Sequence, residues 1–174
     1  SEMCIRDSFP TVVSPNPENP EGFYLAVELA KEHGADFILG SDPDADRVGI
    51  MVRTKEDDFV VISGNQTGVL LLDYLIGAKR RTGKMPDKPV ALKTIVTTEM
   101  ARKVAESNGV TCYDTFTGFK FMAEKKNQLE SQGLGHVIMS YEESYGYMLG
   151  DYVRDKDAVT ASLILTEMAA WYAV

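Results

Sequence analysis

The sequence is poor in cysteine. Its two cysteines, Cys4 and Cys112, lie far apart and belong to no CxxC pattern or cysteine–histidine cluster. A disulfide framework needs more cysteines, and a zinc site needs more ligands at closer spacing, so the sequence predicts neither. We therefore expect a protein of the reducing cytoplasm.

Long apolar runs and long basic runs are also missing. No stretch of about 18 apolar residues occurs, and the N-terminus lacks the order of a signal peptide, so no membrane partner is expected. The chain has 18 Lys and Arg against 26 Asp and Glu, a formal net charge of -8. Because phosphate backbones attract basic surfaces, this balance disfavours a nucleic-acid partner. A small anionic ligand held by a few local cations is compatible with it.

What is present indicates a folded α/β protein. Of the 174 residues, 44% are hydrophobic and 25% charged, which is the globular range. Short apolar runs alternate with helical patterns along the whole chain, as in a largely parallel sheet whose faces are covered by helices. We expect strands at 37–39, 48–52, 59–62, 90–96, 110–113 and 137–140. We expect helices at 21–33, from 63 through 76, at 98–107 and 117–129, and from 157 onward.

The expected architecture is a three-layer α/β/α domain with a mixed, mainly parallel sheet over residues 61–174. It is preceded, over residues 9–60, by the C-terminal part of a second, similar domain. Residues 1–8 show no periodicity, and we expect them to be a non-native leader. We also expect truncation, because Ser1 is not an initiator methionine and the apolar stretch 163–174 carries no helix-ending signal.

The acidic loop, residues 42–47 (DPDADR), follows the predicted strand 37–39. Asp42, Asp44 and Asp46 alternate, so in an extended loop their side chains point the same way and can converge on one hard cation. Mg²⁺ suits a few carboxylates best. A merely solvated acidic turn is the alternative, but Arg47 favours the metal site because a cation beside a bound metal can share phosphoryl oxygens.

A second polar group, the glutamate loop (residues 142–146, EESYG), follows the predicted strand 137–140. Glu142 offers carboxylate acceptors and Ser144 a hydroxyl, a combination suited to holding sugar hydroxyls. Lys120 lies in the first turn of a predicted helix, where the helix dipole favours anions. A lysine at such a position indicates a function.

Four segments together resemble the α-D-phosphohexomutase family, most closely the phosphoglucomutases. They are GSDPDADR at 40–47, TGFKF at 117–121, YEESYG at 141–146 and RDKD at 154–157, in the family's order. The resemblance implies Mg²⁺ on Asp42, Asp44 and Asp46. It makes Arg47 and Lys120 catalytic, with Lys120 as general acid/base or as stabiliser of the transferring phosphoryl. The implied substrate-binding residues are Thr117, Gly118, Glu142, Glu143, Ser144, Arg154 and Lys156.

The resemblance also implies an activity: interconversion of glucose 1-phosphate and glucose 6-phosphate through a phosphoserine and a glucose 1,6-bisphosphate intermediate. Family members have four domains, and the serine loop of the first and the phosphate loop of the fourth do not occur in this sequence. Ser14 lies in SPNP, which lacks the threonine, alanine and histidine of the serine loop. We expect the missing domains 1 and 4 as partners, a phosphosugar as ligand, and no mutase activity from this chain alone.

Several alternatives stay open at this point. Within the family these are phosphomannomutase and phosphopentomutase. Phosphopentomutases tend to have EEAIG where this chain has EESYG at 142–146, so Ser144 favours a hexose phosphate. A haloacid-dehalogenase-like phosphatase also places DxD after a strand, with Asp42 as nucleophile, but expects Thr or Val at Asp46. A non-catalytic phosphosugar-binding module is a further alternative.

Overall fold

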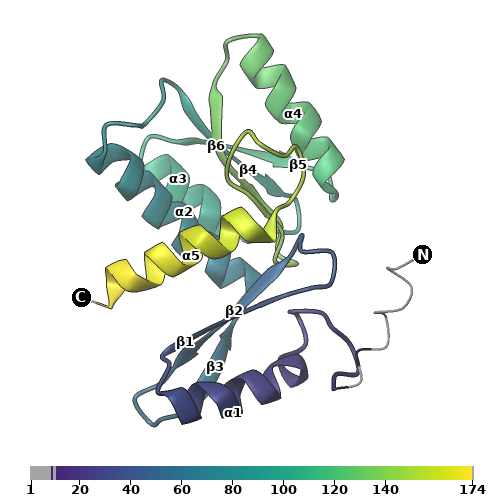
Figure 1. Cartoon of the computed structure of the whole chain (residues 1–174). Helices are drawn as coiled ribbons and strands as arrows, with labels where there is room; N and C mark the ends of the chain where they lie inside the picture. Colours follow the sequence, from purple (N-terminus) through teal and green to yellow (C-terminus); the bar gives the residue numbers. More distant parts are fainter. Residues whose placement is uncertain (1–8, 10, 174) are drawn as a thin grey trace.

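The computed structural model describes residue 9 and residues 11–173, and it contains two sheets with helices around them (Figure 1). The expected leader at 1–8, including Cys4, lies outside the described residues. Among the helices that are described, none is both long and apolar enough to cross a bilayer.

The first sheet has three strands, β1 (Phe37–Ser41), β2 (Val48–Arg53) and β3 (Phe59–Ile62), in that order. A 3-10 turn η2 (Pro20–Phe23) and helix α1 (Tyr24–His33) precede it. The apolar face of this layer buries five side chains together: Phe23, Ala30, Ile38, Met51 and Phe59. As predicted, α1 ends at Gly34, whose φ of 65° is the left-handed conformation that glycine adopts at low cost.

Both pairings in the first sheet are antiparallel, so the largely parallel pairing that the alternating pattern predicted is wrong for these strands. The reason is the length of the connections. Six residues join β1 to β2 (42–47) and five join β2 to β3 (54–58), whereas a parallel crossover takes a dozen or more.

The second sheet has the order β5-β4-β6-β7. Strands β4 (Pro89–Thr94), β5 (Thr111–Thr115) and β6 (His136–Tyr141) are parallel, and the short β7 (Tyr147–Met148) runs antiparallel to β6. Helix α3 (Glu99–Ser107) connects β4 to β5, and α4 (Phe119–Ser131) connects β5 to β6. The predicted mixed, mainly parallel sheet is confirmed here.

Helices cover both faces of this sheet. Along β4, Val90 and Leu92 belong to the core beneath α4, while Ala91 faces the core shared by α2 (Gly64–Arg81) and α3. This alternation is what a strand buried on both faces shows, and it gives the expected α/β/α layers. Helix α2 begins at a capping box in which Ser63 and Gln66 bond each other's backbone N–H.

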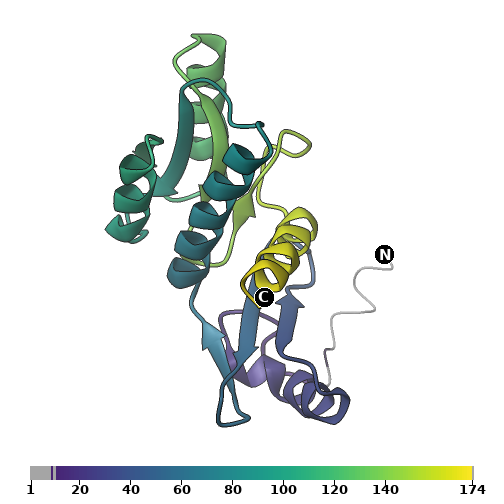
Figure 2. The same cartoon turned by 90° about the vertical axis from the view of Figure 1, so that its left-hand side faces the viewer.

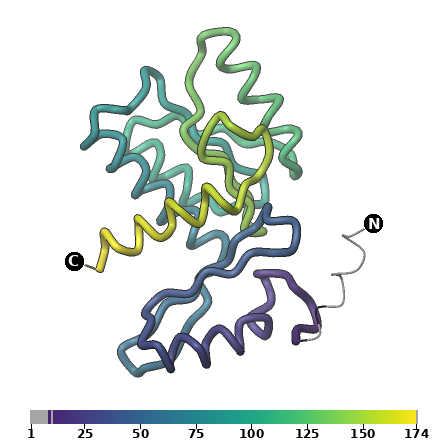
Figure 3. Tube along the Cα trace, viewed as in Figure 1, coloured from purple at the N-terminus to yellow at the C-terminus, as the bar shows by residue number. Residues whose placement is uncertain are grey.

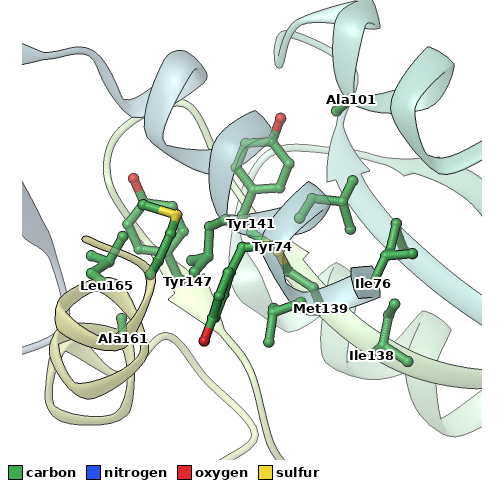
Figure 4. Packing of buried hydrophobic residues seen from close by; sticks show 14 of the residues in the cluster. Tyr74, Ile76, Ala101, Ile138, Met139, Tyr141, Tyr147, Ala161 and Leu165 are labelled. Atoms are coloured by element: carbon green, nitrogen blue, oxygen red, sulfur yellow. The ribbon is translucent and has the colours of Figure 1, made fainter. Parts of the chain in front are cut away.

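Helix α5 (Ala158–Tyr172) lies between the two sheets (Figure 2). Its buried Ala161 and Leu165 share one core with Tyr141 and Tyr147, whose rings stack with centroids 6.3 Å apart (Figure 4). Val48 and Ile50 of β2 join the same core. The shared core brings the β1–β2 loop to the β6–β7 loop (Figure 3). Residue 60, near which the domain boundary is expected, is part of β3.

Candidate functional site

The acidic loop folds around Asp42, which is only 5% exposed. Its Oδ1 accepts hydrogen bonds from the backbone N–H of Asp46 (3.2 Å) and Arg47 (3.1 Å), and its Oδ2 accepts one from Arg47 Nε (2.9 Å). Ala45 takes a φ of 56°, which turns the chain back so that these donors reach one carboxylate. The loop is therefore largely held by its own residues.

The three aspartates converge as the spacing predicted. One carboxylate oxygen from each of Asp42, Asp44 and Asp46 lies within 4.8 Å of the others. Asp46 Oδ1 is buried and finds no hydrogen-bond partner among the described residues. A buried acceptor without a donor is costly, and three hard oxygen donors around it form a set that Mg²⁺ accepts.

The charges in the acidic loop are not balanced. Burial disfavours the Asp42 carboxylate, but hydrogen bonds from the Arg47 backbone and side chain outweigh it and lower the Asp42 pKa. Burial, together with repulsion from Asp42 and Asp44, raises the pKa of Asp46 even though Lys156 opposes the shift. Repulsion of this kind is relieved when a cation binds between the carboxylates.

The glutamate loop connects β6 to β7. The Glu142 N–H donates to Gly146 O (3.0 Å), and Tyr145 has a φ of 68°, so the chain reverses tightly. Burial raises the pKa of Glu142, while the Ser144 hydroxyl and the Lys156 ammonium oppose that shift. Glu142 and Ser144 thus place a carboxylate and a hydroxyl together.

The two loops are in direct contact. Arg47 and Gly146 form an isolated antiparallel bridge, and the Val48 N–H donates to Tyr145 O (3.1 Å). The Ala158 N–H, at the start of α5, donates to Ala45 O (3.0 Å). The backbone therefore fixes the acidic loop against the glutamate loop.

Lys156 lies where the segments meet. Its Nζ is 2.6 Å from Asp46 Oδ2 and 5.9 Å from the ring centroid of Phe119, the first residue of α4. A Cβ on Gly146 would lie 2.9 Å from Lys156 Cδ, so only glycine fits there easily. Burial opposes the Lys156 charge, but the Asp46 carboxylate outweighs it and raises the Lys156 pKa. The segments singled out in the sequence therefore converge on this side chain.

The remaining predicted residues make no side-chain hydrogen bond or ion pair with Lys156 among the described residues. Thr117 and Gly118 precede α4, where Gly118 has a φ of 105° that a side chain would strain. Lys120 is in the first turn of α4 as predicted; it is exposed, with Nζ 4.8 Å from the Phe121 ring centroid. Arg154 is exposed and bonds Asn127 of α4 (2.5 Å).

Three contributors were not foreseen. Glu18 Oε1 lies 3.5 Å from Arg47 Nη1. The hydroxyls of Thr94 and Thr97 donate hydrogen bonds to the carboxylate of Glu143, which therefore points away from Glu142. A signal existed for Thr94, because it ends a buried strand and the carboxyl ends of parallel strands gather at one edge. Nothing in the sequence marks Glu18.

Comparison with known proteins places these features in context. A family model described as phosphoglucomutase/phosphomannomutase, alpha/beta/alpha domain III, matches residues 63–173, and the domain II model matches residues 1–55. The phosphoglucomutase of Staphylococcus epidermidis is 37% identical over 171 residues, which cover 98% of this chain. The chain spans about 30% of the length of that relative.

Solved structures share the fold. A phosphoglucomutase/phosphomannomutase family protein from Burkholderia thailandensis superposes with a TM-score of 0.65 at 18% identity, over 89% of this chain and 31% of that one. Aspergillus fumigatus N-acetylphosphoglucosamine mutase, solved with GlcNAc-6P and magnesium, gives 0.59 at 12% identity, over 85% and 35% of the two chains.

Proposed function

This chain belongs to the phosphoglucomutase/phosphomannomutase family, and from that premise we propose that it supplies the metal loop and the sugar loop of a full-length phosphoglucomutase. That enzyme interconverts glucose 1-phosphate and glucose 6-phosphate through a phosphoserine and a glucose 1,6-bisphosphate intermediate. The observation that carries the proposal is the contact of the acidic loop with the glutamate loop, with Lys156 Nζ 2.6 Å from Asp46.

Asp42, Asp44 and Asp46 would hold Mg²⁺. The buried Asp46 Oδ1, which has no hydrogen-bond partner among the described residues, supports this choice. When bound, the ion supplies positive charge to phosphoryl oxygens during transfer. Arg47, anchored on Asp42, adds a fixed guanidinium beside them. We assign Arg47 to stabilising the charge of the transferring phosphoryl.

Sugar recognition falls to the other segments in this proposal. Glu142 accepts hydrogen bonds from sugar hydroxyls, and Ser144 donates or accepts one. Lys156 and Arg154 bind the substrate phosphate, and Thr117 and Gly118 line the substrate. Lys120, in the adjoining turn of α4, moves the proton of the attacking or leaving hydroxyl.

The proposal extends to partners and location. The rest of the parent enzyme, including its domains 1 and 4, would provide the phosphoserine and a further phosphate site. The cytoplasm is the proposed location, and the free, buried thiol of Cys112 suits its reducing conditions.

The phosphatase alternative would use Asp42 as a nucleophile. Both oxygens of Asp42 already accept hydrogen bonds, from two backbone N–H groups and from Arg47. This supports a structural and metal-binding carboxylate over an attacking one. Incubation with a phosphosugar and isolation of an aspartyl-phosphate at Asp42 would favour the phosphatase.

A direct test is a titration of the ¹⁵N-labelled 174-residue chain with glucose 6-phosphate in the presence of Mg²⁺. We expect amide shifts at residues 117–120, 142–146 and 156, and much weaker ones with unphosphorylated glucose. Mannose 6-phosphate in the same titration measures the preference between the two hexoses. A chain that shows no shift with either phosphosugar contradicts the proposal.

A further inference from the structure

Glu143 belongs to the glutamate loop, but its side chain is bound elsewhere. Its Oε2 accepts hydrogen bonds from the hydroxyls of Thr94 (2.9 Å) and Thr97 (3.0 Å). Those two hydroxyl oxygens are 2.7 Å apart, and both threonines are buried, at 0% and 3% exposure. The three groups form one compact polar cluster at the end of β4.

The turn that carries the threonines is itself held firmly. The Thr97 N–H donates to Thr94 O (3.1 Å), and the ammonium of Lys93, which is 0% exposed, donates to Thr97 O (3.1 Å). Glu99 (2.7 Å) and Asp114 (2.9 Å) neutralise that ammonium. A buried cation that is paired and hydrogen-bonded in this way fixes the backbone around it.

The backbone of Glu143 is held from another side. A Cβ on Gly64, the first residue of α2, would lie 2.0 Å from Glu143 O and 3.0 Å from Tyr145 N. The glutamate loop therefore rests directly on the start of α2, and glycine permits that approach. Side chain and backbone together leave Glu143 one position.

We propose that Glu143 is a positioning residue for phosphohexose binding, which acts through Thr94 and Thr97 and does not contact the sugar. By fixing the middle of the loop on the β4 turn, it orients its neighbours Glu142 and Ser144 toward the substrate. The inference rests on the proposed function of the glutamate loop. It reassigns Glu143 from the substrate-binding set to the support beneath it.

The test compares two substitutions at one position in the 174-residue chain, by NMR titration with glucose 6-phosphate. Glu143→Ala removes the acceptor, and we expect the affinity to fall about tenfold. Glu143→Gln keeps an oxygen that can accept from the threonine hydroxyls, and we expect it to stay within about threefold of wild type. The Mg²⁺ affinity of the acidic loop serves as the internal control and should be unchanged in both variants.

A double-mutant cycle identifies the route of the effect. If Glu143 acts only through the threonines, the variant Thr94→Val/Thr97→Val loses as much affinity as Glu143→Ala, and combining all three changes adds no further loss. Losses that add up, or a Gln variant as weak as the Ala variant, would mean that Glu143 binds the sugar directly and would overturn the proposal. So would a Glu143→Ala variant with wild-type affinity.

Backbone ¹⁵N relaxation without ligand separates this inference from the proposed function. We expect the backbone order parameters of residues 142–146 to fall in Glu143→Ala and to stay unchanged in Glu143→Gln. Should Glu143→Ala not fold, the threonine variant replaces it in this measurement. Unchanged order parameters in residues 142–146 would overturn the anchoring role of Glu143. A wild-type chain that does not bind glucose 6-phosphate would contradict the proposed function, and the relaxation data alone would then test the anchoring role.

Discussion

The acidic loop and the glutamate loop differ in what holds them. Each follows a strand and turns at a non-glycine residue with positive φ, Ala45 in one and Tyr145 in the other. In the acidic loop the hydrogen bonds to Asp42 come from within the loop. In the glutamate loop, Glu143 is bound by Thr94 and Thr97, which lie far away in the sequence.

The origin of these hydrogen bonds explains why the three aspartates converge whereas the two glutamates diverge. Three aspartates at alternate positions converge because the loop curls around Asp42. The adjacent Glu142 and Glu143 diverge, one toward Lys156 and the other toward the threonines. Convergence suits a metal ion, and divergence leaves one carboxylate for recognition and one for support.

The largest effect is expected on Mg²⁺ binding by the acidic loop. Asp46→Asn removes the charge of the carboxylate whose Oδ1 has no hydrogen-bond partner among the described residues. We expect the Mg²⁺ affinity of this variant, measured by calorimetry, to fall about 100-fold. Asp36→Asn, at a carboxylate 86% exposed, is the matched control and should bind Mg²⁺ like wild type. Equal affinity in the two variants would place the metal elsewhere.

The next prediction concerns the contact between the glutamate loop and Gly64 at the start of α2. Gly64→Ala forces a Cβ against Glu143 O, and we expect a loss of about 1–3 kcal/mol in the free energy of unfolding. Gly77→Ala on the same helix meets only the flexible end of Arg81 and should stabilise by up to about 1 kcal/mol. Urea unfolding measures both, and the same sign for both variants would contradict the close approach.

Glu142→Ala should weaken glucose 6-phosphate binding about tenfold without changing Mg²⁺ affinity, because only the glutamate loop is altered. Burial raises the Glu142 pKa above its ordinary value of 4.5. As the pH falls, wild-type binding should therefore decline at a higher pH than an ordinary glutamate would give. In Glu142→Gln only the decline due to the phosphate should remain, and an unchanged pH profile in that variant would exclude Glu142 from binding.

The smallest effect concerns α5, whose first residue, Ala158, donates a hydrogen bond to Ala45 O of the acidic loop. Asp157 caps α5 by accepting from the N–H groups of Val159 and Thr160 (both 3.1 Å), so Asp157→Ala should cost about 1 kcal/mol in thermal unfolding. Burial opposes the charge, but the hydrogen bond from the Thr160 hydroxyl, together with those from the two N–H groups, lowers the Asp157 pKa below its ordinary 3.8. The stabilisation should be present above that pH and disappear as the pH falls through the lowered value. A difference between wild type and variant that does not shrink as the pH falls below 3.8 would argue against the cap.

The same contrast explains what the sequence could predict. The convergence of Asp42, Asp44 and Asp46 depends on local spacing, and the prediction is confirmed. The start of α2 at Ser63 and the end of α1 at Gly34 also depend on local signals, and the structure confirms both. The partners of Glu143 depend on which strand ends lie side by side, which no local pattern contains. The alternating pattern predicts parallel pairing, and this is wrong for the first sheet because its connections are too short for a parallel crossover.

One measurement tests the central claim, that the acidic loop binds a divalent cation directly beside the glutamate loop. Mn²⁺, added at low occupancy to the ¹⁵N-labelled chain, broadens the amides nearest to it. We predict the strongest broadening at residues 42–47, then at 142–146 and 156, with residues 109 and 133 unaffected. Broadening centred instead on the other acidic group, Glu130, His136 and Asp151, or spread evenly over the chain, would contradict the account.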